Sequence, residues 1–302
     1  MPGKLLKYEE MSSPQFSNLI REKTAFFIPI SPLEGHGPHL PLGVDFFNAI
    51  HFADSIAKIT VEKFPDFDAV VVPGIPLGTG VYRQPGSLRI GAIPLYELVR
   101  GIGESLASFG FRYIFLLSGH GSPKHIVAME AACLKVSRKR GIHMHNLSGA
   151  LAIRFLKGEF IDRISANLPR PLNESERGLF KSDIHGGWWE TSMMLLLRPE
   201  LVDENYKNLP SVERGPKTRS SDSGYFGTPS RAYKEFAEAS LGVMAEEASL
   251  AVERIISGKA GLTETISHLY RMIPLRPYFR RNLYAILLIL ITLGLILLVF
   301  SG

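Results

Sequence analysis

The residues with the clearest chemical potential lie together in one short segment. Residues 34–45 read EGHGPHLPLGVD, which combines Glu34, His36, His39 and Asp45 with several glycines and prolines. Carboxylate oxygens and imidazole nitrogens are the ligands expected of a hydrolytic zinc, manganese or iron site. In an extended segment Glu34 and His36 point to the same side, because side chains of a strand repeat every two residues. The segment therefore predicts a metal centre.

Asp45 and His39 each admit a second interpretation. A carboxylate such as Asp45 can bridge two cations roughly 3.5–4 Å apart, a spacing that suits activation of one water between them. Asp45 could instead begin a helix as its N-cap. For His39, beside Pro38, we expect a role in packing or in supporting a ligand rather than in binding metal.

A second histidine segment follows an apolar run. Residues 113–117 read YIFLL, and residues 118–122 read SGHGS, with His120 at the centre. Glycines let the backbone approach a bound group closely, so His120 is a candidate ligand at the end of a strand. A plain strand-to-helix turn is the alternative interpretation.

The third segment combines a histidine with a carboxylate. Residues 183–192 read DIHGGWWETS and lead into an apolar helix. His185 on a glycine-rich loop, followed by Glu190, predicts a proton-transfer group next to a metal ligand. Trp188 and Trp189 could wall a small flat substrate, or both could pack against the sheet.

The elements around these segments must bring them together. Strands are predicted over 24–30, 69–73 and 113–117, with 143–147 as a further candidate, and helices over 45–59, 94–109, 126–140, 190–197 and 231–256. This alternation predicts a mainly parallel sheet covered by helices on both faces. Ligands bind at the carboxyl ends of parallel strands, where the segment at 34–36 and His120 both fall.

Length and composition exclude several classes of protein. The 302 residues suffice for one large α/β domain or two small ones. The net charge of +5 is not concentrated in basic tracts with interleaved aromatics, so no nucleic-acid partner is expected. Cys133 is the single cysteine, which excludes an intramolecular disulfide and fits a reducing compartment.

The carboxyl-terminal region has a different composition. Residues 283–300 read LYAILLILITLGLILLVF, without a charge, and Arg276, Arg280 and Arg281 precede them. As a helix this run spans about 27 Å, close to the hydrocarbon thickness of a bilayer. A buried core helix is the alternative, but the pattern predicts a transmembrane tail anchor with the catalytic body on the cytoplasmic side. The predicted divisions are a catalytic domain over 1–262, a connector over 263–282 and the anchor over 283–300.

Together, the three segments resemble the creatininase family of amidohydrolases. The family pattern runs E-x-H-G-P-H-L-P-L-G-T-D, N-G-H-G-G-N and H-A-G-x-x-E-T-S, and the resemblance covers roughly residues 24–257. QPGSL at 84–88 and GYFGTP at 224–229 are weaker marks of the same pattern. The resemblance implies a three-layer α/β/α sandwich and a homo-oligomer, often a hexamer in this family.

The resemblance also implies roles for individual residues. Glu34, Asp45 and His120 would hold one divalent cation, and Asp45 would bridge to a second cation held by His36. His185 would be the catalytic histidine, which moves a proton between the activated water and the leaving nitrogen.

One ligand departs from the family pattern. Creatininase uses a glutamate two residues after the histidine that matches His120, but this chain has Ser122 there. Glu190 is therefore the expected replacement ligand, and creatinine itself is not the expected substrate. Ser118 and Pro123 are further departures from the pattern.

The function predicted from the resemblance is hydrolysis of a C–N bond in a small cyclic or linear amide. Two divalent cations (zinc, manganese or iron) would activate the attacking water. The alternative is a catalytically inactive, membrane-tethered binding or scaffold protein on the same fold. The expected substrate contacts are Gly121, Trp188 and Trp189.

Overall fold

A parallel sheet forms the centre of the molecule. The computed structural model describes residues 3–214 and 222–300. Its five-stranded sheet has the order β1-β3-β2-β4-β5, and every neighbouring pair is parallel. The strands are β1 (Leu5–Lys7), β2 (Thr24–Pro29), β3 (Asp68–Val71), β4 (Tyr113–Leu117) and β5 (His143–Asn146). Their carboxyl ends therefore meet at one edge.

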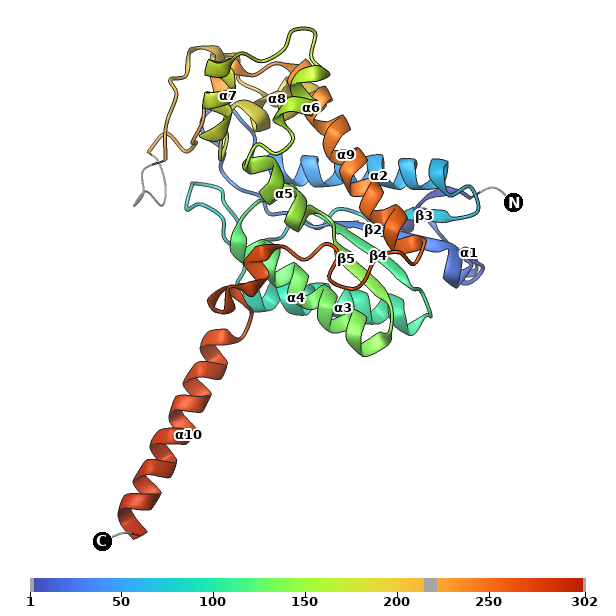
Figure 1. The fold of residues 1–302 in the computed structure, drawn as a ribbon, viewed down its shortest axis with the longest axis vertical. Coiled ribbons are helices and arrows are strands. Elements are labelled where there is room, and N and C mark those ends of the chain that lie inside the picture. Colours follow the sequence, from blue (N-terminus) through green and yellow to red (C-terminus); the bar gives the residue numbers. More distant parts are fainter. Residues whose placement is uncertain (1–2, 215–221, 301–302) are drawn as a thin grey trace.

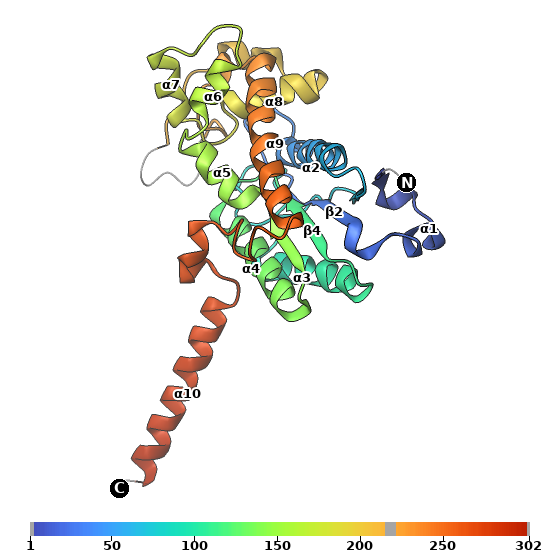
Figure 2. The ribbon, with the colours of Figure 1, turned by 45° about the vertical axis from the view of Figure 1, so that its right-hand side comes forward.

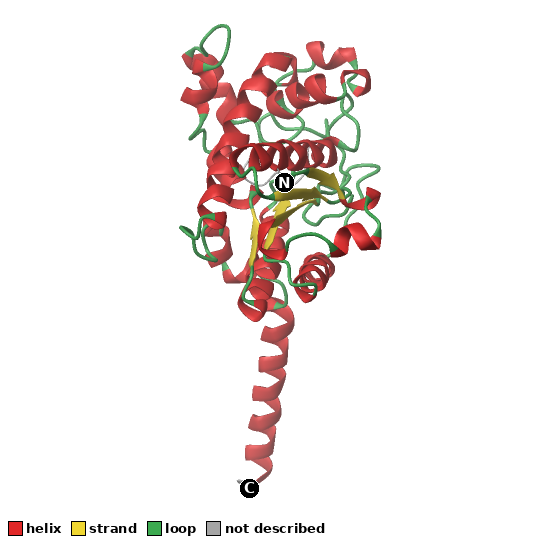
Figure 3. Cartoon of the chain, turned by 90° about the vertical axis from the view of Figure 1, so that its right-hand side faces the viewer, coloured by secondary structure: helices red, strands yellow, loops and turns green. Residues whose placement is uncertain are grey.

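Helices cover both faces of this sheet (Figures 1 and 3). On one face lie α2 (Val44–Lys63) and α9 (Lys234–Ile256), and on the other α3 (Ala92–Ser108) and α4 (Pro123–Arg140). Successive side chains of a strand point to opposite faces, so Phe27 joins the apolar core beneath α2 and α9. Phe26 joins the second core against α3 and α4. The predicted α/β architecture with a parallel sheet is confirmed.

Shorter helices gather beyond the carboxyl edge of the sheet, around one end of α9 (Figures 1 and 2). They are α5 (Ser148–Leu156), α6 (Ile161–Ala166), α7 (Glu174–Lys181) and α8 (Trp188–Leu197). A further short helix, α1 (Ser13–Ser17), follows β1. Single turns of 3-10 helix lie over Tyr8–Glu10, Arg21–Lys23, Pro199–Leu201, Glu204–Asn208, Pro229–Arg231, His268–Arg271 and Ile273–Leu275.

The last helix, α10 (Phe279–Phe300), projects away from the body (Figures 1 and 2). Side chains 294–300 of the predicted span lie outside the described part of the chain. No helix among the described residues has the length and apolar character needed to cross a membrane. The predictions of a transmembrane tail anchor and a membrane localisation are therefore wrong, and the predicted membrane partner is unsupported.

A buried carboxyl group ties the segment after α9 to the body. Glu130 on α4 is fully buried, and its carboxylate accepts hydrogen bonds from the Ser267 backbone N–H and hydroxyl at 2.8 and 3.0 Å. Burial raises the pKa of Glu130 to about 7, because these hydrogen bonds only partly offset the loss of water. Part of the segment predicted as a connector thus packs on the body, while the boundary at residue 262 stays a prediction.

Glu130 should make stability depend on pH. Its pKa lies above the ordinary value of 4.5, so the folded chain keeps a proton that the unfolded chain loses. The stabilisation is complete below about pH 4.5 and is lost as the pH rises through about 7, by on the order of 3 kcal/mol. We expect Glu130→Gln to flatten the fall in unfolding free energy across this range, measured by urea denaturation. Glu62→Gln, which changes an exposed carboxyl on α2, is the control, and equal slopes for both variants would contradict the assignment.

Candidate metal centre

Five predicted ligands meet at the carboxyl edge of the sheet, on segments far apart in the sequence. Glu34 and His36 lie in the loop after β2, Asp45 in the first turn of α2, His120 in the turn after β4, and Glu190 in the first turn of α8. All five side chains are buried or nearly so. Because β2 and β4 are neighbours in the sheet, the loops that follow them must lie side by side.

The ligand atoms form two groups that share one carboxylate. In the first group, Nδ1 of His120 lies 3.2 Å from Oε2 of Glu34 and 3.0 Å from Oδ2 of Asp45. In the second group, Nε2 of His36 lies 3.5 Å from Oδ1 of Asp45 and 3.6 Å from Oε2 of Glu190. Within each group of three residues the ligand atoms lie within 4.8 Å of one another. Asp45 thus presents one oxygen to each group.

The hydrogen bonding of these residues fits a bound cation. In the described part of the chain, Glu34 Oε2, His36 Nε2 and Asp45 Oδ2 are buried and make no hydrogen bond. Buried polar atoms without partners are costly, and a divalent cation would satisfy all three. The Nδ1–H of His36 donates to the Glu34 backbone carbonyl at 2.8 Å, which leaves Nε2 directed at the carboxylates, as metal-binding histidines require.

Electrostatics in the cluster point in the same direction. Burial raises the pKa of Glu34 to about 7 and that of Glu190 to about 8. Burial opposes charge on His36 as well, but the carboxylates of Glu190 and Asp45 outweigh it and raise the pKa of His36 to about 10. His36 and His120 in turn hold the pKa of Asp45 well below its usual range despite burial. Cations would replace shared protons here, so metal affinity should rise with pH.

His185 lies against the centre with a defined orientation. Its Nε2–H donates to the Gly35 carbonyl at 2.8 Å, and its ring centroid lies 4.2 Å from that of His36. Burial and the positive charge of His36 hold the pKa of His185 well below its usual range. The neutral ring therefore keeps Nδ1 as a proton acceptor. His185 could also act as a ligand, because it forms a further compact group with Glu34 and His36.

The sequence analysis missed the contribution of Tyr82. Its backbone N–H donates to Oε1 of Glu34, and its ring centroid lies 4.6 Å from that of His185. Tyr82 thus touches both a candidate ligand and the candidate proton carrier. A tyrosine in a loop carries no local pattern that would reveal this position, apart from its nearness to the family mark at 84–88.

Asp183 organises the start of α8. Its carboxylate accepts hydrogen bonds from the backbone N–H groups of Trp188 at 2.6 Å and Trp189 at 2.8 Å, and so caps the helix that carries Glu190. Gly187 makes this approach possible, since a Cβ there would lie 1.8 Å from Asp183 Oδ1. Gly187 occupies the N-cap position of α8, and Asp183 lies four residues before it, so no capping pattern in the sequence marks Asp183.

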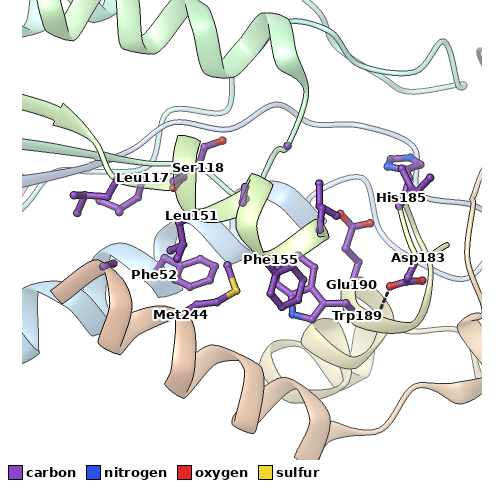
Figure 4. A pocket seen from close by; sticks show the side chains of 18 of the residues that line it. Phe52, Leu117, Ser118, Leu151, Phe155, Asp183, His185, Trp189, Glu190 and Met244 are labelled. Carbon is purple, nitrogen blue, oxygen red and sulfur yellow. Dashed lines mark hydrogen bonds between the residues drawn. The ribbon is translucent and has the colours of Figure 1, made fainter. Parts of the chain in front are cut away.

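The predicted supporting residue and the predicted substrate contacts lie in different surroundings. His39 is buried outside the candidate metal groups, and its Nε2 lies 2.9 Å from the Thr191 hydroxyl. Trp188 packs in the aromatic core and does not line the cavity beside the centre. Gly121 and Trp189 do line that cavity, which Figure 4 shows from close by.

Comparisons with known proteins agree with the motifs. The family model for creatininase, creatinine amidohydrolase, matches residues 9–252, which confirms the resemblance seen in the sequence. A mycofactocin precursor peptide peptidase of Mycolicibacterium smegmatis is 28% identical over 220 residues, 68% of this chain and 74% of that protein. The creatinine amidohydrolase of Pseudomonas putida is 29% identical over 185 residues, 58% of this chain and 65% of that protein.

Solved structures share the fold. One described as "Creatininase Mn" superposes with a TM-score of 0.65 at 22% identity, over 83% of this chain and 99% of its own. A mutant creatininase of "Zn-Zn type" superposes with a TM-score of 0.66 at 21% identity, over 84% of this chain and 99% of its own.

Removal of the cap on α8 should affect both stability and metal binding. We expect Asp183→Ala to cost about 1–2 kcal/mol of unfolding free energy, because two backbone N–H groups lose their acceptor. It should also weaken metal binding by loosening Glu190, whereas Asp183→Asn keeps one acceptor and should lose less. Urea denaturation and zinc titration measure the two effects. Asp162→Ala, which breaks an exposed ion pair with Arg177, is the control, and losses equal to this control would rule out the capping role.

Proposed function

The chain belongs to the creatininase family of amidohydrolases, and from this premise we propose that it hydrolyses a small cyclic or linear amide at a centre of two divalent cations. The main support is the position of Asp45, whose two carboxylate oxygens face two separate ligand groups. A hydrolase acting on carbon–nitrogen bonds, rather than an inactive scaffold, also agrees with the family and with the clustering of Glu34, Asp45, His120, His36 and Glu190.

The residues divide naturally between the two cations. Glu34, Asp45 and His120 would hold the first, and His36, Asp45 and Glu190 the second. Two divalent cations held there would supply Lewis-acid activation of the attacking water near neutral pH. Nitrogen and carboxylate ligands suit zinc, manganese and iron. The buried carboxylates and imidazoles exclude bulk water from the reacting atoms and fix their own orientation.

His185 is suited to carry the proton of the reaction. Nδ1 accepts a proton from the attacking water and donates it to the leaving nitrogen, so that the amide yields a carboxylate and an amine. The hydrogen bond from Nε2 to the Gly35 carbonyl holds the tautomer that this transfer needs. The Tyr82 ring restricts the rotation of His185 through their contact. Gly121 and Trp189 are the proposed substrate contacts, because both line the cavity.

A peptide bond is a second candidate substrate. A relative named for peptidase activity on the mycofactocin precursor is 28% identical to this chain over 220 residues. Ser122 also stands where the resemblance to creatininase leads us to expect a glutamate. A screen should therefore include formamides, cyclic amides and short peptides. Assembly into an oligomer, implied by the resemblance, stays a prediction.

Replacement of Asp45 tests the shared centre. We expect Asp45→Ala to lose both cations. Asp45 is the one residue that the two ligand groups share, so its removal leaves each group with two ligands instead of three. Zinc and manganese per chain are measured after dialysis, by elemental analysis. Asp54→Ala, on the same helix and away from the centre, should keep full occupancy. Two retained cations in Asp45→Ala would refute the bridging role.

Replacement of His185 separates proton transfer from metal binding. We expect His185→Ala to keep its cations and to lose about 10²–10⁴-fold in kcat, the usual contribution of general acid–base catalysis. His51→Ala on α2, a half-buried histidine outside the centre, is the matched control for turnover on the substrate found by the screen. Loss of a cation from His185→Ala would make His185 a ligand instead.

A further inference from the structure

The cavity beside the metal centre has two chemically different ends (Figure 4). His185 and Glu190 line one end, whereas Phe52, Leu117 and Met244 lie together at the other. The space between atoms amounts to about 730 Å³, counting the open mouth.

The apolar end is built from several elements of the core. Phe52 comes from α2, Leu151 and Phe155 from α5, and Met244 from α9. All four belong to the apolar core on the α2 and α9 face of the sheet. Among the described residues that line the cavity, the ionisable side chains (Asp183, His185 and Glu190) all lie at the end that meets the metal centre.

The shape of this cavity indicates an occupant. Protein interiors normally pack with few voids, and an apolar cavity offers water too few hydrogen-bond partners. Ala152 and Ala248 contribute small side chains to its wall, and larger residues there would fill space. Because the space opens onto the reacting groups, its natural occupant is a part of the substrate.

We propose that the substrate carries an apolar substituent, which fills this cavity while the amide group lies at the metal centre. The inference rests on the proposed function and narrows its substrate class. An aliphatic chain and the apolar side chain of an amino acid share the required chemistry. A charged substituent would lose its hydration there without gaining a charged partner at the apolar end.

A chain-length series tests this proposal. With zinc-loaded full-length protein and the n-alkanamides from acetamide to octanamide, we expect kcat/KM to rise by about fourfold per methylene until the cavity is full. A comparison of N-acetyl-leucine amide with N-acetyl-alanine amide tests whether the substituent is the apolar side chain of an amino acid. A gain along either series supports an apolar substituent and shows whether it is an aliphatic chain or an amino-acid side chain. Measurable hydrolysis with no gain along either series overturns the proposal.

Variants locate the effect in the cavity. Ala248→Leu should reduce the ratio of octanamide to acetamide kcat/KM by at least tenfold, and Ala152→Leu on α5 is a second variant in case the first fails to fold. Ala251→Leu introduces the same change on α9 at a half-buried position that does not line the cavity. An unchanged ratio in a folded cavity variant would contradict the proposal.

Binding without turnover separates this inference from the proposed function. The n-alkanoates from acetate to octanoate, as product analogues, are titrated into the zinc-loaded protein by calorimetry. Affinity that rises about fourfold per methylene in the native chain, but not in Ala248→Leu, supports the cavity as the binding site. Flat affinity overturns the inference even if amides are hydrolysed. Rising affinity without any amide or peptide hydrolysis would sink the proposed function instead.

Discussion

The buried carboxylate of Asp45, held between two imidazoles, is the interaction on which the rest of the site depends. Burial of a charge is costly unless it is paired, and Asp45 is paired on both sides by His36 and His120. The turn after β4 must come close to α2 for this pairing. Gly119 allows the approach, because a Cβ at that position would lie 2.4 Å from the backbone oxygen of Asp45.

The pairing of Asp45 with His36 and His120 depends on the parallel sheet, which determines where the loops lie. β2 and β4 are hydrogen-bonded neighbours, so the loops after them carry Glu34 and His120 to the same edge. The third contribution comes from outside the sheet, where Asp183 caps α8 and so directs Glu190 to the centre. Three segments more than 60 residues apart thus supply one ligand cluster, and none of them could form it alone.

In the function that we propose, the metal centre carries out hydrolysis and the cavity beside it selects the substrate. The polar cluster has the groups needed for hydrolysis and is nearly closed by its own side chains. Selection between amides would then fall to the apolar walls contributed by α2, α5 and α9. A family of enzymes can keep the first part and change the second through a few side chains, since fold and reaction type do not determine the substrate.

The sequence alone predicted the candidate ligands and the segments that carry them, and it determined the alternation of strands and helices. These are local properties, because periodicity and residue type report on backbone preference and burial. The tertiary structure decided which oxygen of Asp45 faces which histidine, and it separated Trp189 in the cavity from Trp188 in the core. It also revealed the contacts of Tyr82, the short helices α5–α7 and the error in the membrane prediction. Such features depend on how distant segments pack. The local sequence pattern of one segment contains no information about its distance from another.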